Sequence, residues 1–291
     1  MRALAGEPIA LRRAGGGCLT VTEAVLLGAV QGLTEFLPVS SSAHLIFVQH
    51  YLSGFDRSKA PLFDVTLHVG TLFSLLVYYR REVLDMATGM FASGRKEQTA
   101  PDALDRRYVF LIVLATMATA LIAFPLRDFA ESEFKDPRMI RIVGLELFVT
   151  GLLLVTAERL SRRHAGRARV EPADAVVVGL AQGLGAAFGG VSRSGATIAA
   201  ALYRGLDPQA AVRFSFLLSI PAILGAVVLE GKSHLGGLAP ADKIPLVAGT
   251  VTAFLVGMAA IRMVVEFVQR GRLVWFAVYC WMVGLAVVLF A

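Results

Sequence analysis

The sequence predicts an all-α polytopic membrane protein, built as an inverted-topology repeat with six spanning helices and two re-entrant helical hairpins. The chain is 56% hydrophobic and 17% charged, whereas soluble domains are about 45–50% apolar and about 25% charged. Six apolar runs are long enough to cross a hydrocarbon core, which needs about 20 residues. Two further stretches, 28–46 and 179–198, repeat one phrase, and each is interrupted by small and hydroxyl residues. Interrupted apolar segments at matching places in two halves favour a binding site at the middle of a membrane.

Composition also excludes several classes of protein. The net charge of +6 is spread over short links between apolar runs, so it indicates membrane topology, and no nucleic-acid partner is expected. Cys18 and Cys280 are too few and too far apart for a disulfide framework or a zinc site. Residues 1–19 have no apolar core of signal-peptide length and are interpreted as an N-terminal tail.

After the tail, the chain divides into a first repeat at 20–160, a basic cytoplasmic link at 161–173 and a second, inverted repeat at 174–291. Each repeat begins with a hairpin, at 21–52 or 174–204, and continues with three spans. The predicted spans are 62–79, 108–126 and 139–157 in the first repeat, and 211–229, 245–266 and 273–290 in the second.

Each hairpin is a pair of apolar pieces that are too short to cross a membrane comfortably. The pieces are 21–37 with 43–52, and 174–188 with 196–203. A non-helical hinge at membrane depth must be buried in protein or line a wet cavity. A hairpin leaves on the side where it entered, and three spans are an odd number. The second repeat is therefore expected to be upside down relative to the first.

The distribution of Lys and Arg predicts the orientation. Links 80–107 and 158–173 carry an excess of Arg, which favours a cytoplasmic position for them and places both chain termini outside. The basic N-terminal tail argues mildly against this orientation.

The first hairpin carries Gln31 and Glu35, which are spaced i, i+4 and therefore share one face of a helix. The second carries Arg193, whose planar guanidinium matches phosphate or carboxylate oxygens. Ionisable groups at membrane depth are costly and are functional candidates. Two interpretations stay open and are compatible: Arg193 binds a phosphate, or it pairs with Glu35 to hold the two hairpins together.

Hydroxyl side chains gather at both hinges. They can cap the helix that follows, whose free N–H groups then form an anion site; small residues also allow close helix packing, which is the preferred interpretation for Gly28, Gly32, Gly179 and Gly183. His44 is a candidate acid, base or nucleophile or a satisfied polar residue. The other histidines, at 50, 68, 164 and 234, are interpreted as structural. The hinge candidates for substrate binding are Ser40, Ser42, Ser192, Ser194, Gly195 and Thr197.

Residues 31–44 read Gln-Gly-Leu-Thr-Glu-Phe-Leu-Pro-Val-Ser-Ser-Ser-Ala-His, and residues 190–197 read Gly-Val-Ser-Arg-Ser-Gly-Ala-Thr. These two motifs resemble the signatures of the undecaprenyl-diphosphate phosphatase (bacitracin-resistance protein) family. The likeness extends from about residue 20 to the end of the chain. The resemblance implies a membrane enzyme that removes the terminal phosphate of a C55 polyprenyl diphosphate and so recycles the carrier lipid for cell-wall synthesis. It also implies a divalent cation, Mg²⁺ or Ca²⁺, and a plasma-membrane (inner-membrane) site open to the outer face.

By position, the resemblance gives catalytic roles to Glu35, Ser41, His44 and Arg193 and a metal site at Glu35 and Gln31. The nucleophile remains open among Ser41, His44 and water, with Ser41 favoured. Many family members have Glu where this chain has Gln31, although Gln is an accepted variant there, and Gly189 replaces the family's usual Pro. The first departure puts the strength of metal binding in doubt, and the second loosens the hinge before Arg193.

The rival interpretation is a transporter or flippase of an anionic solute or lipid phosphate, because inverted repeats with broken helices are a transporter design. A Glu, a Ser, a His and an Arg at one hinge exceed what binding alone requires, which favours the enzyme. The expected partners are the polyprenyl diphosphate lipid and the bilayer; the sequence leaves open whether the chain forms a homodimer.

Overall fold

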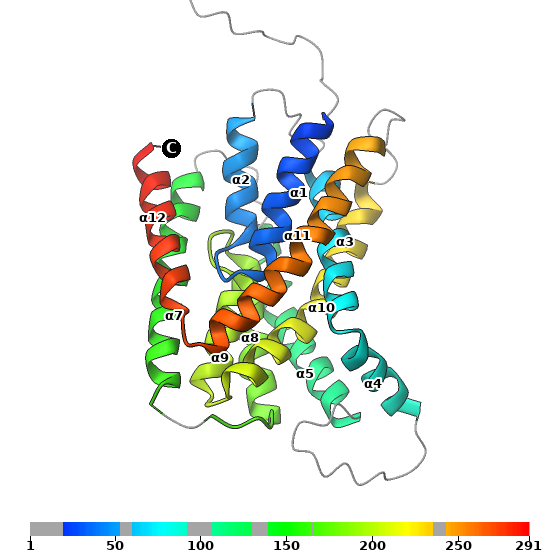
Figure 1. The fold of residues 1–291 in the computed structure, drawn as a ribbon, viewed down its shortest axis with the longest axis vertical. Helices are drawn as coiled ribbons and strands as arrows, with labels where there is room; N and C mark the ends of the chain where they lie inside the picture. Colours follow the sequence, from blue (N-terminus) through cyan, green and yellow to red (C-terminus); the bar gives the residue numbers. More distant parts are fainter. Residues whose placement is uncertain are drawn as a thin grey trace, which may run out of the picture.

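The structure is a computed structural model of the chain. It describes residues 20–52, 60–91, 106–129, 139–163, 166–234 and 243–290. The predicted tail, 1–19, lies outside these ranges, as does His164. Within them the fold is helical, and its only β-type pairing is an isolated bridge between Arg167 and Leu206. The helices (Figure 1) are α1 (Val21–Phe36), α2 (Ser41–Tyr51), α3 (Ala60–Tyr78), α4 (Arg80–Phe91), α5 (Arg106–Ala123), α7 (Ile140–Ser161), α8 (Pro172–Ala187), α9 (Arg193–Tyr203), α10 (Pro208–His234), α11 (Lys243–Gln269) and α12 (Val274–Phe290).

The described helices are those of a multi-pass membrane protein. Five of them, α3, α5, α7, α10 and α11, are long and apolar enough to cross a bilayer. The sixth predicted span corresponds to α12, which is apolar but has 17 residues. Large apolar side chains on the outer helices stay exposed, among them Met117, Leu121 and Phe290. A soluble monomer rarely exposes so much apolar surface, so these faces suit lipid.

One helix was not predicted. The link 80–107 contains α4, whose Val83 and Met86 pack against the core while Leu84 and other side chains stay exposed. Such a two-sided helix is too polar to be found by a search for apolar runs.

Local sequence explains where the first hairpin begins and turns. Thr20 and Glu23 form a capping box at the start of α1. Pro38 ends the helix by forcing Leu37 into an extended conformation. Ser40 then caps α2 by accepting a hydrogen bond from the N–H of Ala43, at 3.3 Å.

The second hairpin uses the same devices with different residues. Glu171 and Asp174 form the capping box of α8, and Pro172 occupies its first turn. The helix ends before Gly189 and Gly190, and Ser192 caps α9 by accepting from the N–H of Gly195.

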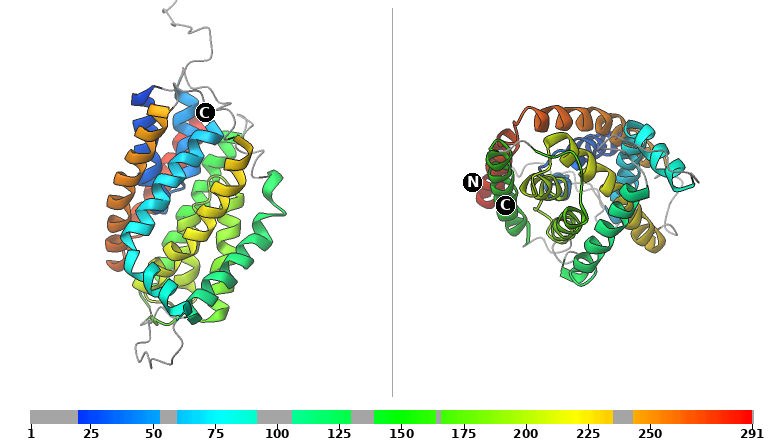
Figure 2. Two further views of the ribbon diagram at one scale, coloured as in Figure 1. Left: turned by 90° about the vertical axis from the view of Figure 1, so that its right-hand side faces the viewer. Right: turned by 90° about the horizontal axis from the view of Figure 1, so that it is seen from below.

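The first helix of each hairpin packs against a long apolar helix that is distant in the sequence. α1 lies against α11, where a Cβ added at Gly28 would meet the carbonyl oxygen of Gly249 at 2.4 Å. α8 lies against α5, where a Cβ added at Gly179 would meet the carbonyl oxygen of Ala115 at 2.2 Å. Gly32 and Gly183 repeat these contacts one turn further along. The preferred interpretation of the four glycines as packing residues is therefore confirmed. Figure 2 shows the same helices from two further sides.

Candidate active site

The tips of the two hairpins touch. In Figure 1, α1 and α2 occupy the upper half of the molecule and α8 and α9 the lower half. Ser40 donates its hydroxyl to the carbonyl of Gly189 at 2.6 Å, and Ser194 donates to the carbonyl of Leu37 at 3.1 Å. Each hairpin thus bonds the backbone of the other, and the residues predicted for chemistry lie around this junction.

Glu35 is the centre of the cluster. Its side chain is 1% exposed and forms an ion pair with Arg193 from the other hairpin. The same carboxylate accepts hydrogen bonds from Gln31 Nε2 at 2.9 Å and from the Ser41 hydroxyl at 2.7 Å. A buried carboxylate with a cation and two donors is well compensated for its loss of water. The structure therefore brings together Gln31, Glu35, Ser41 and Arg193 as the sequence predicted.

Arg193 is the first residue of α9, and its side chain is 21% exposed. The backbone of α8 lies close behind it, because a Cβ at Gly185 would meet the Cα of Arg193 at 2.9 Å. A guanidinium has five N–H donors. A partly exposed Arg193 can therefore keep contact with Glu35 and present further donors to an anion.

His68 was interpreted as structural, yet it reaches the same carboxylate. Its Nε2 lies 3.8 Å from Glu35 Oε2, and its Nδ1 lies 2.7 Å from the carbonyl oxygen of Asp64. Since a carbonyl only accepts, Nδ1 carries a proton. The available signal was a histidine inside a predicted span, where polar groups are costly.

Ser40, Ser192, Ser194 and Thr197 are buried and have hydrogen-bond partners inside the protein. Ser40 bonds Gly189 and caps α2, and the Ser192 hydroxyl lies 3.2 Å from that of Ser194. Thr197 donates to the carbonyl of Arg193 and lies 2.5 Å from the Ser215 hydroxyl. These hydroxyls hold the hinge in shape. Gly195 keeps the first turn of α9 close to Pro38, since a Cβ there would meet the Pro38 side chain at 3.3 Å, and Ser42 is half-buried beside Ser41.

His44 contacts the Ser40 carbonyl and Tyr279 rather than the Ser41 hydroxyl, which a role as acid or base would suggest. Its Nδ1 lies 2.6 Å from the carbonyl oxygen of Ser40 and its Nε2 lies 2.8 Å from the hydroxyl of Tyr279 on α12. The two rings are stacked, with centroids 5.6 Å apart. The group that contacts the Ser41 hydroxyl is Glu35. Tyr279 was not anticipated, because no sequence pattern links α12 to α2.

Oxygen atoms for a divalent cation are present in the cluster. The described residues contain no group of three or more His, Cys, Asp or Glu that could hold a metal ion. They do contain the carboxylate of Glu35 and the buried Oε1 of Gln31, which has no hydrogen-bond partner in the described part of the chain. Mg²⁺ and Ca²⁺ prefer such oxygen donors, and Mg²⁺ keeps several waters. The residues fit a cation with few protein ligands.

A family model described as "Bacitracin resistance protein BacA" matches residues 24–286. The chain belongs to this family. It is similar to the undecaprenyl-diphosphatase of Syntrophotalea carbinolica, with 41% identity over 267 residues, which are 91% of this chain and 97% of the relative. The undecaprenyl-diphosphatase of Alkaliphilus metalliredigens is 40% identical, covering 94% of this chain and 99% of the relative. That of Rubrobacter xylanophilus is 42% identical, covering 90% and 94%.

The matched residues begin inside α1 and end inside α12, and they include the turns of both hairpins. The family assignment therefore covers every residue of the cluster, from Gln31 to Tyr279. This agrees with the resemblance that the two motifs carry.

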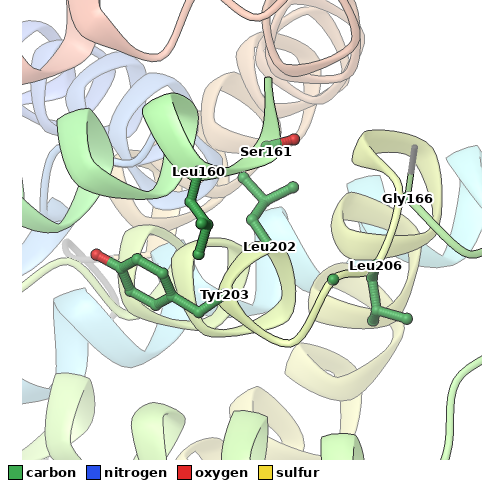
Figure 3. Close-up of a pocket in the computed structure, with 7 residues that line it drawn as sticks. Leu160, Ser161, Gly166, Leu202, Tyr203 and Leu206 are labelled. Atoms are coloured by element: carbon green, nitrogen blue, oxygen red, sulfur yellow. The ribbon is translucent and has the colours of Figure 1, made fainter. Parts of the chain in front are cut away.

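A separate cavity of about 180 Å³ lies at the other end of α9 (Figure 3). Leu160 and Ser161 of α7 line it, together with Leu202, Tyr203 and Leu206. Tyr203 is ten residues beyond Arg193, about 15 Å along the helix. The cavity is not part of the cluster around Glu35.

Proposed function

We propose that the chain is an integral membrane phosphatase that hydrolyses undecaprenyl diphosphate to the monophosphate and inorganic phosphate. The observation that carries the proposal is the contact of Ser41 and Arg193 with one buried carboxylate, at the junction of the two hairpins. The relatives named undecaprenyl-diphosphatase support the choice of substrate. This reaction returns the carrier lipid to cell-wall synthesis, and it fits a family named for bacitracin resistance.

The chemistry follows from the bond between Ser41 and Glu35. A nucleophile within hydrogen-bond distance of a base, with the base oriented by a third group, is the usual arrangement for covalent catalysis. Glu35 takes the Ser41 proton as Oγ attacks the terminal phosphorus. A P–O bond to Ser41 forms, the bond from that phosphorus to the bridging oxygen breaks, and the lipid monophosphate leaves. Glu35 gives the Ser41 proton to the departing monophosphate and is ionised again. Water then attacks the phosphorus of the phosphoserine; Glu35 takes a proton from this water and passes it to Ser41 Oγ as the P–Oγ bond breaks, and inorganic phosphate leaves.

Arg193 and the first turn of α9 bind the phosphate oxygens. The guanidinium meets the negative charge that phosphoryl transfer spreads over those oxygens, and stabilisation of this kind dominates such reactions. The N–H groups at the starts of α2 and α9 add partial positive charge on either side of the junction.

A divalent cation, Mg²⁺ or Ca²⁺, belongs to the proposal. Glu35 and the free Oε1 of Gln31 would hold it, and it would offset the charge of the diphosphate. With one carboxylate in place of two, we expect the protein to hold this ion weakly when no substrate is bound.

The proposed topology is an inverted repeat with six spans, including the 17-residue α12, and two re-entrant hairpins. The matching glycine contacts of α1 with α11 and of α8 with α5 support it, because an approximate two-fold axis would exchange these pairs. The protein would lie in the plasma membrane with the site open to the outer face, and the lipid tail would stay between helices.

The test is phosphate release by the purified protein in detergent, with a C55 polyprenyl diphosphate and Mg²⁺ or Ca²⁺. We expect Ser41→Ala, Glu35→Gln and Arg193→Ala each to lower kcat/KM by about 100-fold or more. Ser161→Ala and Arg159→Ala are matched controls that lie away from the cluster and should keep full activity.

One result would overturn the proposed activity, and another would overturn the role of Ser41. Wild-type protein that binds the lipid but releases no phosphate with any divalent ion would favour transport or flipping of a lipid phosphate. Full activity in a folded Ser41→Ala protein would remove Ser41 as the nucleophile and leave water or His44.

A further inference from the structure

A carboxylate that the proposed reaction does not use lies inside α7. Glu146 belongs to the predicted span 139–157, and its side chain is half-buried. Its Oε2 accepts a hydrogen bond of 2.7 Å from the backbone N–H of Gly190, in the hinge between α8 and α9. An ionisable side chain inside a span is costly, and by default it has a functional reason.

Thr150 stands one helical turn further along α7, on the same face. Its Oγ1 donates to the carbonyl of Gly190 at 3.2 Å and accepts from the N–H of Ser192 at 3.0 Å. Glu146 and Thr150 together therefore bond three backbone groups of a segment that has left α8 and has not yet entered α9. Buried backbone groups need such partners wherever helical bonds are absent.

The hinge also lies directly on the surface of α7. A Cβ added at Gly190 would meet the carbonyl oxygen of Val143 at 2.1 Å and the Cβ of Glu146 at 2.6 Å. Only a glycine allows this approach. The opposite side of the hinge is held by Ser40, which donates to Gly189. The segment is thus fixed from both sides immediately before Arg193.

We propose that Glu146 and Thr150 are positioning residues, which set the hinge at 189–192 so that Arg193 and the N–H groups of α9 face the substrate phosphate. The inference rests on the proposed function, because phosphate binding is the task for which the hinge is positioned. The contact of Glu146 with the hinge is the hydrogen bond that it accepts from the N–H of Gly190.

The test compares variants that separate the acceptor from the charge. Glu146→Gln keeps a side-chain oxygen for the Gly190 N–H and loses the charge, whereas Glu146→Leu loses both. Thr150→Val removes the second partner. Thr156→Val is the matched control, since Thr156 is also on α7 but contacts Leu152 and Tyr203.

Two quantities are measured on each folded protein: hydrogen–deuterium exchange of a peptide covering 186–194, and kcat and KM for phosphate release. We expect Glu146→Leu to exchange this peptide at least about tenfold faster, because the hinge opens locally. Its kcat/KM should fall about 10- to 100-fold, as displaced catalytic groups typically cost. Glu146→Gln and Thr156→Val should stay within about twofold of wild type on both measures, and Thr150→Val should resemble Glu146→Leu.

Unchanged exchange in both Glu146→Leu and Thr150→Val would overturn the proposal, and so would faster exchange with wild-type kinetics. A Glu146→Gln protein as impaired as Glu146→Leu would show that the charge, rather than the acceptor, is needed. If Glu146→Leu does not fold, Thr150→Val and Glu146→Gln still decide. A wild-type protein without phosphatase activity would refute the proposed function alone, and the exchange data would then decide whether α7 holds the hinge.

Discussion

At the scale of single residues, the carboxylate of Glu35 contacts several polar side chains at once. The carboxylate of Glu35 pairs with the guanidinium of Arg193 and accepts hydrogen bonds from Gln31 and Ser41. His68 Nε2 lies 3.8 Å from its Oε2. A second carboxylate beside Glu35 should therefore change the affinity of the cluster for a cation.

Gln31→Glu is expected to bind Mn²⁺, a paramagnetic substitute for Mg²⁺, about tenfold more tightly than wild type in the absence of lipid, because it adds a charged oxygen donor one turn from Glu35. Electron paramagnetic resonance of free Mn²⁺ measures the affinity. Gln182→Glu is the matched control, since Gln182 has the same place as Gln31 in the repeated sequence phrase and bonds Thr119 instead. Equal affinities in the two variants would contradict a cation site at Gln31 and Glu35.

Ser40 has a φ of 67°, and in the described part of the chain it is the one residue other than glycine with positive φ. Such a conformation costs about 1–3 kcal/mol in a residue with a side chain. Ser40→Ala loses the hydroxyl and keeps this strain, whereas Ser40→Gly loses the hydroxyl and relieves it. We therefore expect the alanine variant to be less stable than the glycine variant by about 1 kcal/mol. Thermal unfolding in detergent checks the order, and a more stable alanine variant would contradict it.

The sequence predicted Glu35 and Arg193 because ionisable groups at membrane depth are costly. It predicted Gln31 and Ser41 through their helical spacing and the motif that resembles the family signature, and the structure places all four together. The sequence did not identify the residues that brace them. Tyr279 is 235 positions from His44, and Glu146 is 44 positions from Gly190. Helical spacing tells which residues share a face, but not which face meets which. Those partners follow only from the packing of whole helices.

At the scale of elements, the helix interruptions at Pro38 and Gly189 could be predicted from the sequence because proline and glycine act on the local backbone. The six apolar runs could also be predicted from the sequence, because each is a continuous stretch of apolar residues. The helix α4 was missed because its signal is amphipathic and its apolar side, with Val83 and Met86, depends on the core it meets.

The contact of each hairpin with the opposite half depends on glycine. Gly28→Leu and Gly179→Leu should each lower the unfolding temperature or prevent folding, because the added side chain meets the backbone of α11 or α5. Gly225→Ala is the control, as nothing lies within 4 Å of an added Cβ there. Fluorescence-detected size-exclusion chromatography with heating measures the effect. Wild-type stability of both leucine variants would contradict the close contacts.

At the scale of the whole molecule, the proposed orientation can be tested by labelling. In a chain without Cys18 and Cys280, Thr22→Cys at the start of α1 should react with an impermeant maleimide on intact spheroplasts. Asp85→Cys on α4 should react only after permeabilisation, because the basic links are expected in the cytoplasm. Both positions are exposed in the structure. The reverse pattern would invert the orientation, and equal labelling would contradict a single one.

The reciprocal bonds of Ser40 and Ser194 have a consequence for how the protein works. A carrier that uses alternating access must part its two halves at the centre, first on one side and then on the other. Here that movement would break both serine bonds and pull Arg193 from Glu35, and it would separate the groups that we propose act on the phosphate. We therefore expect turnover to proceed while the two hairpins stay in contact.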